Sequence, residues 1–421
     1  MIDINVLRSD PERVKKAVRD KQEKTDVDAI LELDREWREL VQETEQKQAV
    51  RNTVSKDIGT AKKEGKDAKE EIEEMQALSS EVKQLEKRCR EIREKIDSLL
   101  LWVPNIPDPD VPVGGSEEEN TTVKEWGEKR DFGFTPLPHW ELGESLGIVD
   151  FGSGARLAGT GFYSLIGKGA RLERALINFM LDMHTSKHGY TEIFPPILVN
   201  RETMKGSGQI PKMADQMYHC DVDDLFLIPT AEVPLTNMRG GEILSEEELP
   251  LYYTAYTPCF RREAGAAGKD TRGMIRVHQF NKVELLKLVK PEESEKELES
   301  LLGNAEAVLQ AFDLPYRIVV LCTGDTSFAA AKTYDIEMWA PGTDKWLEVS
   351  SCSNFRDFQA RRCDIRFRRG NNKPEQVHTL NGSGVALPRL MIALIETFQN
   401  KDGTIDIPEP LREYTGFSVI S

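Results

Sequence analysis

Two segments that lie far apart in the chain carry the side chains needed to hold a nucleoside triphosphate. The first, residues 260–280, contains Arg261, Glu263 and Phe280, and the second, residues 382–389, ends in a further arginine and opens an apolar helix pattern. Arginine offers planar, paired N–H donors for phosphate oxygens, and an aromatic ring can stack on a purine. No glycine-rich phosphate loop of the usual spacings follows a strand pattern, so a nucleotide site here would be built from arginines.

The 260–280 segment is predicted to form two strands joined by a long glycine-rich loop, residues 264–273. The loop holds Lys269 and Arg272, and Arg276 and Glu284 follow it. Loops of this length are often functional. A surface hairpin with ordinary salt bridges would have a similar composition, so this segment alone leaves both readings open.

Thr230, Ala231 and Glu232 follow a strand-like run. A hydroxyl and a carboxylate two residues apart face the same way on an extended chain, where they could recognise a hydroxyl or an ammonium group. Taken alone, the same residues fit a helix N-cap better.

A polar stretch at 348–354 offers oxygen ligands. Glu348 and Ser351, three residues apart, suit Mg²⁺ bound to ATP phosphates, although serine-rich strand ends are also ordinary. The six histidines and six cysteines show no His-Glu-x-x-His, Cys-x-x-Cys or zinc-finger spacing, so we expect no zinc site and no catalytic histidine. The cysteines are expected to be reduced thiols.

Residues from about 27 to 100 are predicted to form two long helices that fold back as an antiparallel hairpin. Apolar residues recur at three- and four-residue steps, as between Ile30 and Leu40, which is typical of a coiled-coil seam. The turn is expected near residues 59–67.

Part of this hairpin is basic. Between residues 47 and 69 there are seven basic and three acidic residues. This fits a solvated helix face or a surface for an RNA backbone. The seven are Lys47, Arg51, Lys56, Lys62, Lys63, Lys66 and Lys69.

The rest of the chain mixes helix and strand patterns without regular alternation. This predicts an α+β fold, with an antiparallel sheet flanked by helices. A proline-rich stretch follows residue 103 and is typical of a linker. We therefore expect an N-terminal domain over 1–103, a linker over 104–120 and a second domain over 121–421. Helices are expected at 172–183, 291–312 and 387–398, and strands at 225–228, 318–321 and 334–339.

The net charge of −16 argues against a generally basic nucleic-acid binder, while it allows a local basic patch. No run of about 18 apolar residues is present, so we expect no membrane span. The start of the chain has no basic region followed by an apolar one, so we expect no secretion signal and a cytoplasmic protein.

Taken together, these segments resemble the seryl-tRNA synthetase family of the bacterial type, within the class II aminoacyl-tRNA synthetases. Residues 260–280 resemble motif 2 of that class, 382–396 resemble motif 3, and 170–200 resemble motif 1, which forms its dimer interface. The narrower resemblance rests on 230–232, 277–284, 350–354 and 379–384, and on the N-terminal hairpin. It extends over the whole chain.

The resemblance implies an ATP-dependent ligase that joins L-serine to tRNA(Ser), and also to tRNA(Sec). It implies a homodimer that uses ATP and Mg²⁺, with Arg261 and Arg389 as the catalytic cations and Glu348 and Ser351 as the Mg²⁺ ligands. Arg262 stands where the family often has a small polar residue. The implied serine site is Thr230, Ala231, Glu232, Arg261, Glu284 and Ser383. The implied ATP site is Arg261, Arg262, Glu263, Val277, Phe280, Glu348, Val349, Ser350, Ser351 and Arg389. The hairpin would bind tRNA through the seven basic residues named above.

Two other functions fit parts of the pattern. An enzyme of the same fold could activate an amino acid and load a carrier protein, but such a relative is expected to lack the long hairpin. A non-catalytic RNA-binding paralogue is expected to have lost Arg261, Glu263 or Arg389, and all three are present.

Overall fold

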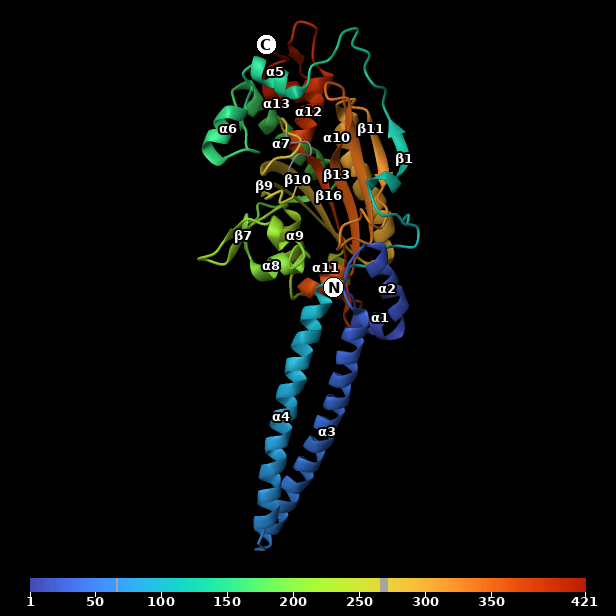
Figure 1. Cartoon of the computed structure of the whole chain (residues 1–421), viewed down its shortest axis with the longest axis vertical. Helices are drawn as coiled ribbons and strands as arrows, with labels where there is room; N and C mark the ends of the chain where they lie inside the picture. Colours follow the sequence, from blue (N-terminus) through green and yellow to red (C-terminus); the bar gives the residue numbers. More distant parts are fainter. Residues whose placement is uncertain (66, 266–271) are drawn as a thin grey trace. The chain divides into compact units, whose positions relative to one another are not determined.

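The N-terminal hairpin consists of α3 (Val27–Lys63) and α4 (Lys69–Leu100), so both long helices and the turn lie where the sequence predicts them (Figure 1). The side chain of Asp26 caps α3 by accepting a hydrogen bond from the backbone N–H of Ala29. Ile30 and Ile96 are among the buried residues of the seam. Two short helices, α1 (Ile4–Ser9) and α2 (Pro11–Asp20), precede the hairpin.

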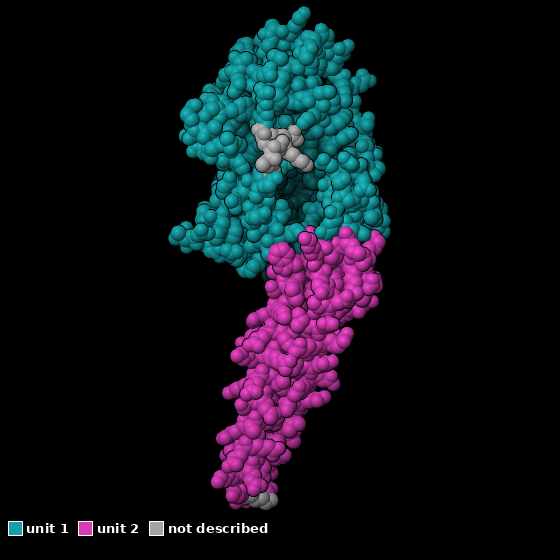
Figure 2. Space-filling model, in the orientation of Figure 1, with its two compact units in different colours: residues 1, 20–22, 105–421 teal, residues 2–19, 23–104 magenta. Residues whose placement is uncertain are grey.

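The structure is a computed structural model that describes residues 1–65, 67–265 and 272–421. It contains two compact units, which Figure 2 distinguishes by colour. One unit comprises residues 2–19 and 23–104, and the other comprises residues 1, 20–22 and 105–421. In the described part of the chain, no helix is long and apolar enough to cross a membrane.

The larger unit is built on an eight-stranded sheet, which confirms the α+β prediction. All neighbouring strands pair antiparallel except β4 and β9, which are parallel. In order across the sheet the strands are β1 (Thr121–Trp126), β11 (Tyr316–Val320), β12 (Lys332–Ala340), β13 (Lys345–Arg356), β16 (His378–Ala386), β10 (Gln279–Val289), β9 (Leu251–Phe260) and β4 (Thr191–Glu192).

Strand β10 shows how the sheet separates the core from the polar site. Its odd-numbered residues Val283 and Leu285 join the main core, which also buries residues of α7 (Lys168–Ser186), α10 (Ser294–Ala311) and α12 (Leu387–Thr397). Its even-numbered residues Leu286 and Leu288 pack in a second cluster with α9 (Glu232–Asn237). Because side chains alternate along a strand, Lys282 and Glu284 face the α9 side.

Smaller elements complete the unit. The remaining helices are α5 (His139–Ser145), α6 (Phe151–Ala158), α8 (Arg201–Gly206), α11 (Phe358–Cys363) and α13 (Glu409–Thr415), with 3₁₀ turns η1 (Glu117–Glu119), η2 (Ala214–Gln216), η3 (Glu246–Glu248) and η4 (Pro291–Glu293). The remaining strands are β2 (Val149–Asp150), β3 (Ser164–Leu165), β5 (Leu198–Asn200), β6 (His219–Cys220), β7 (Leu225–Leu227), β8 (Ile243–Ser245), β14 (Arg366–Arg368), β15 (Glu375–Gln376), β17 (Ile405–Asp406) and β18 (Val419–Ile420).

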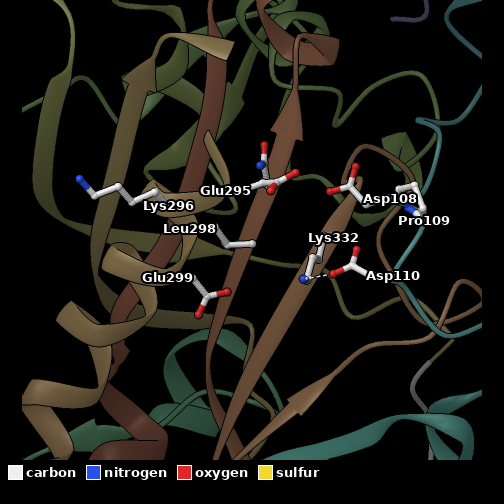
Figure 3. Close-up of a pocket in the computed structure, with 9 residues that line it drawn as sticks. Asp108, Pro109, Asp110, Glu295, Lys296, Leu298, Glu299 and Lys332 are labelled. Atoms are coloured by element: carbon white, nitrogen blue, oxygen red, sulfur yellow. Dashed lines mark hydrogen bonds and ion pairs between the residues drawn. The ribbon is translucent and has the colours of Figure 1, made fainter. Parts of the chain in front are cut away.

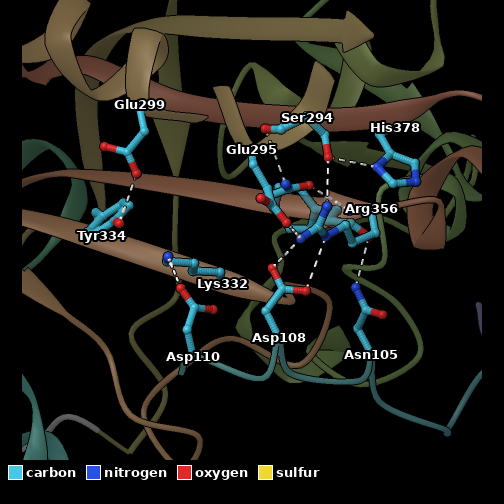
Figure 4. Close-up of polar contacts among 12 residues, drawn as sticks. Asn105, Asp108, Asp110, Ser294, Glu295, Glu299, Lys332, Tyr334, Arg356 and His378 are labelled. Carbon is cyan, nitrogen blue, oxygen red and sulfur yellow. Dashed lines mark hydrogen bonds and ion pairs between the residues drawn. The ribbon is translucent and has the colours of Figure 1, made fainter. Parts of the chain in front are cut away.

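The segment after the hairpin is fixed to the sheet by polar contacts (Figure 4). The Asn105 side chain donates to the carbonyl oxygens of Ala329 and Phe355 at 2.9 and 2.8 Å. Asp108 accepts two hydrogen bonds from Arg356, at 3.1 and 2.8 Å. A paired contact of this kind holds both position and orientation, so the start of the segment is anchored despite its proline-rich composition.

Candidate active site

A buried cluster of polar side chains lies where β10 faces the start of α9. The Thr230 hydroxyl donates to Glu284 Oε2 at 2.8 Å, and it accepts from the backbone N–H of Glu232 at 3.2 Å. Lys282 Nζ donates to the Thr230 hydroxyl at 2.8 Å and forms an ion pair with Glu284. Thr230 therefore accepts a hydrogen bond at the start of α9 and also belongs to a polar pocket. A role at the helix start and a role in binding a ligand are thus compatible for this residue.

Of the two interpretations of this motif, the start of a helix, which the residues alone favour, is the one observed, and the chain is not extended here. Ala231 has helical backbone angles, and Glu232 is the first residue of α9. The helix turns the Glu232 carboxylate to Gln359 of α11, whose Nε2 donates to it at 2.6 Å. Gln359 is itself held by the hydroxyl of Thr379 on β16, at 2.7 Å.

Glu232 is buried, and it forms no ion pair with any residue that the structure describes. Its burial, and secondarily the charge of nearby Glu284, raise the pKa of the Glu232 carboxyl from 4.5 to about 7. The folded protein therefore binds this proton more tightly than the unfolded chain. The resulting stabilisation is complete below pH 4.5 and is lost as the pH rises through 7.

Replacing Glu232 by glutamine is expected to remove this pH dependence, because the amide stays neutral. The ligand-free variant should be more stable than the parent at pH 8.5, by up to about 3 kcal/mol. The advantage should vanish near pH 4.5 to 5. Thermal unfolding of both proteins across this pH range measures the difference, and a difference that does not change with pH would contradict the assignment.

Ser383 and Arg261 border the same pocket. Ser383 lies on β16 directly opposite Glu284 in the strand pairing. Arg261 follows the end of β9, where its Nε donates to the Pro229 carbonyl at 3.3 Å and its guanidinium lies over the Phe280 ring, 5.1 Å from the centroid. An exposed guanidinium beside an aromatic face is suited to a phosphate next to a planar base.

Both described ends of the 264–273 loop are anchored. At the first end, the Gln216 side chain exchanges two hydrogen bonds with the backbone of Ala264, at 3.1 and 3.0 Å. The Arg262 side chain donates to the Asp215 carbonyl at 3.3 Å, which accounts for an arginine at this position. Lys269 lies outside the described residues.

At the other end, a buried histidine connects the loop to α12. The backbone N–H of Met274 donates to His139 Nε2 at 3.0 Å, so Nδ1 carries the proton and donates to Glu396 at 2.8 Å. Glu263 and Arg276 form an ion pair at 2.6 Å between these anchors. The His139 bridge therefore holds this end of the loop to α12.

Glu348, Ser351 and Arg389 come together through an irregularity in β13. The pairing with β12 shifts between Ser350 and Glu348, so Val349 is an extra residue. Such a bulge changes the alternation of side chains, which lets Glu348 and Ser351 share a face although they are three residues apart. Arg389, near the start of α12, donates to the Glu348 carbonyl and lies 3.4 Å from its carboxylate.

The residues next to Glu348 and Ser351 differ in the side-chain groups that they present to the site. Val349 packs in the core, and the Ser350 hydroxyl donates to the Ser383 carbonyl at 2.6 Å, so neither presents a free side-chain group. Asp335 pairs with Ser351 across the strands, and its buried carboxylate oxygen Oδ1 has no hydrogen-bond partner among the described residues. Burial and the charge of Glu348 raise the pKa of Asp335.

Comparison with known proteins identifies the family. A family model described as the seryl-tRNA synthetase N-terminal domain matches residues 1–107, and one described as the tRNA synthetase class II core domain (G, H, P, S and T) matches 218–398. The chain is 53% identical over 424 residues to the serine–tRNA ligase of Thermodesulfovibrio yellowstonii, with both chains covered completely. The chain belongs to the seryl-tRNA synthetase family.

Solved structures agree with this membership. The seryl-tRNA synthetase of Pyrococcus horikoshii, complexed with ATP, is 40% identical and superposes with a TM-score of 0.94 over all of this chain and 99% of that one. The serine–tRNA ligase of Naegleria fowleri, in complex with AMP, is 30% identical with a TM-score of 0.89, over 100% and 99% of the two chains. The seryl-tRNA synthetase fold thus extends over the full chain.

In this member of the seryl-tRNA synthetase family, the basic residues predicted on the hairpin lie mainly on α3. Lys56, Lys62 and Lys63 are exposed, whereas Lys47 forms an ion pair with Glu81 at 2.7 Å. Lys66 lies outside the described residues. The first turns of α4 carry four exposed acidic residues, Glu70, Glu71, Glu73 and Glu74. The two helices therefore differ in charge near the turn that joins them.

Several residues of the site were missed by reasoning from the sequence. Lys282 and Gln359 touch the two buried carboxylates, and Asp335 lies beside the expected metal ligands. A lysine two residues before Glu284 on a predicted strand was a usable signal for Lys282, because alternation places both on one face. No local pattern points to Gln359.

A separate cavity of about 440 Å³ lies between the segment after the hairpin and α10 (Figure 3). Some of its charged groups have partners: Lys332 pairs with Asp110, and Glu299 accepts a hydrogen bond from the Tyr334 hydroxyl (Figure 4). None of the predicted site residues lines it. We assign it no ligand.

Proposed function

We propose that this chain is a serine–tRNA ligase that makes seryl-adenylate from L-serine and ATP and transfers the seryl group to tRNA(Ser). The observation that carries the proposal is the buried Thr230, Glu232 and Glu284 pocket, which adjoins the cationic Arg261. Identity of 53% to a serine–tRNA ligase over the whole chain supports the same activity. We also propose tRNA(Sec) as a substrate and the cytoplasm as the location.

In the first reaction a serine carboxylate oxygen attacks the α-phosphorus of ATP, and the bond from phosphorus to the bridging oxygen of pyrophosphate breaks. Arg261 would hold the serine carboxylate and the α-phosphate, and Arg389 the γ-phosphate. Fixed cations orient the two anions and neutralise charge in the transition state, so no side-chain nucleophile is needed. In the second reaction the terminal ribose hydroxyl of tRNA attacks the seryl carbonyl carbon, and AMP leaves.

Adenine would be recognised by residues near the end of β9 and the beginning of β10, on the two sides of the 264–273 loop. Glu263 would accept from the adenine amino group, Phe280 would stack on the ring, and the backbone of Val277 would lie nearby. Arg262 is bonded to a neighbouring carbonyl at its side chain, so we propose that it supports this segment. The anchors at Gln216 and His139 would keep the adenine-binding residues in place.

Mg²⁺ fits the oxygen donors at the bulge of β13. The Glu348 carboxylate and the Ser351 hydroxyl would hold it, and the unpartnered oxygen of Asp335 adds a third hard donor beside them. The ion would neutralise phosphate charge when bound. The backbone at Val349 and Ser350 would support the ATP site.

The two buried carboxylates would recognise different groups of the serine substrate. We propose that Glu232 accepts from the serine hydroxyl, while Thr230 and Glu284 receive the ammonium, with Ala231 and Ser383 closing the pocket. Alanine would leave Glu232 without its partner in a buried site. Loss of such a partner permits strong discrimination.

We propose three structural assignments for the tRNA reaction. Residues 1–103 form the tRNA-binding domain with its arm at about 27–100, residues 104–120 form a linker, and residues 121–421 form the catalytic domain. The exposed face of α3 would bind the tRNA backbone through the predicted basic residues. The chain would be a homodimer through the α7 region, where Phe194 is 93% exposed just after β4.

Amino-acid-dependent ATP–pyrophosphate exchange tests the activation step. Serine should support exchange, and alanine should not support it at equal concentration. Exchange with another amino acid and none with serine would refute the serine pocket. No exchange with any amino acid would refute the proposed activation.

A further inference from the structure

Lys282 is a buried cation inside the pocket that we assign to serine. Its side chain is 8% exposed, and that of its partner Glu284 is 1% exposed. The ammonium Nζ contacts Glu284 Oε2 and donates to Thr230 Oγ1 at 2.8 Å. Thr230 in turn donates to the same oxygen of Glu284. The three groups form a closed ring of polar contacts.

The acceptors in this ring are the ones that the substrate ammonium needs. A buried carboxylate without a cation is costly, so Lys282 compensates Glu284 when the pocket holds no ligand. When serine arrives, a second ammonium has to approach the same oxygens. Two cations at contact distance repel strongly where water is excluded. The ammonium groups of serine and of Lys282 would therefore both require the same position, beside Glu284 Oε2 and the Thr230 hydroxyl.

We propose that Lys282 is a displaceable counter-ion that occupies the ammonium position of the serine pocket until the amino acid replaces it. The inference rests on the proposed function, since it takes Thr230 and Glu284 as the ammonium receptors. Exchange of one ammonium for another keeps the charge of the buried pocket constant. It also favours ligands with an ammonium group, because only they can compensate Glu284 after the lysine has moved.

The contrasting role would be a fixed support, in which Lys282 stays beside Glu284 and only holds that carboxylate in place. The two roles predict opposite effects when the cation is removed. A fixed support would be needed equally by every ligand of the pocket. A displaceable counter-ion competes with serine, so its loss should spare serine and penalise ligands that bring no ammonium.

The test uses the full chain carrying Lys282→Met. We expect the KM for serine in ATP–pyrophosphate exchange to fall, or to rise by no more than about threefold. The inhibition constant of 3-hydroxypropionate, which lacks the ammonium, should rise about tenfold or more, because its binding would enclose Glu284 without a cation. Parallel weakening of both ligands by about tenfold would overturn the proposal.

A matched control is Lys287→Met, which removes another buried lysine of β10. Lys287 pairs with Glu297 at 2.8 Å on the opposite side of the strand, so its loss should leave the KM for serine and the inhibition constant unchanged. Thermal unfolding of both variants separates a loss of folding from a loss of binding. Exchange by the unmodified protein tests the proposed function separately, since that function fails only if serine supports no exchange there.

A crystal structure of the unmodified protein with L-serine tests the displacement without any variant. We expect Lys282 Nζ to lie more than about 4 Å from Glu284, beyond ion-pair distance, with the serine ammonium in its former place. An intact Lys282–Glu284 pair in the serine complex would overturn the proposal.

Discussion

The Arg389→Ala variant is expected to lower kcat/KM for ATP in serine-dependent exchange by about 100-fold or more. Arg389 lies in the first turn of α12 and is held beside Glu348 at the proposed phosphate end of the site. Loss of one charge-assisted contact to developing phosphate charge removes about 3 kcal/mol of transition-state stabilisation, and that corresponds to roughly two orders of magnitude. Initial rates at varied ATP concentration measure this effect.

Arg412→Ala is a suitable control for this variant. Arg412 is an exposed arginine of α13 that donates to the Ile407 carbonyl at 2.9 Å, and it belongs to no proposed site. Its loss should change exchange by less than about threefold, since surface changes usually have small effects. If Arg389→Ala behaved like this control, Arg389 would not be the γ-phosphate ligand.

Shortening the arm is expected to separate the two reactions. In the proposed variant residues 48–85 are replaced by a short glycine linker, which keeps the base of the hairpin, where Thr44 lies 3.7 Å from Cys89. Exchange should stay within about twofold, whereas serine attachment to tRNA should fall about 100-fold, because several phosphate contacts would be lost. Equal loss of both reactions would show that the arm supports the active site.

Charge variants of the arm give the matched control. Combined replacement of Lys56, Lys62 and Lys63 by alanine should weaken tRNA binding and flatten its dependence on salt. Replacement of Glu70, Glu71 and Glu73 by glutamine alters the acidic turns of α4 and should not weaken binding. Unchanged tRNA binding in the lysine variant would contradict an RNA site on this face of α3.

The regular spacing of apolar residues along the chain predicted most of the helices and strands of the fold. The hairpin helices α3 and α4, the strand pairing of β9 with β10, and the buried helix α12 all follow from spacing of apolar residues and from the loop that separates them. The predicted helix at 172–183 is part of the longer α7. These elements depend on contacts that recur within a few residues, which a sequence displays directly.

Features that depend on distant pairing were not predictable in this way. Regular alternation would put Glu348 and Ser351 on opposite faces of β13, and only the bulge at Val349 brings them together. Gln359 reaches Glu232 from a helix more than a hundred residues away. The helix start at Thr230–Glu232, by contrast, could be predicted, because a threonine hydroxyl that accepts from a nearby backbone N–H is a local feature.

The central claim is that this chain attaches serine to tRNA, and aminoacylation measures it most directly. Labelled serine, ATP and Mg²⁺ should convert tRNA(Ser) to seryl-tRNA with the full chain, and the Arg389→Ala variant should fail to do so at the same concentration. Serine-dependent exchange without any charging of tRNA(Ser), together with transfer of serine to a carrier protein, would contradict the account.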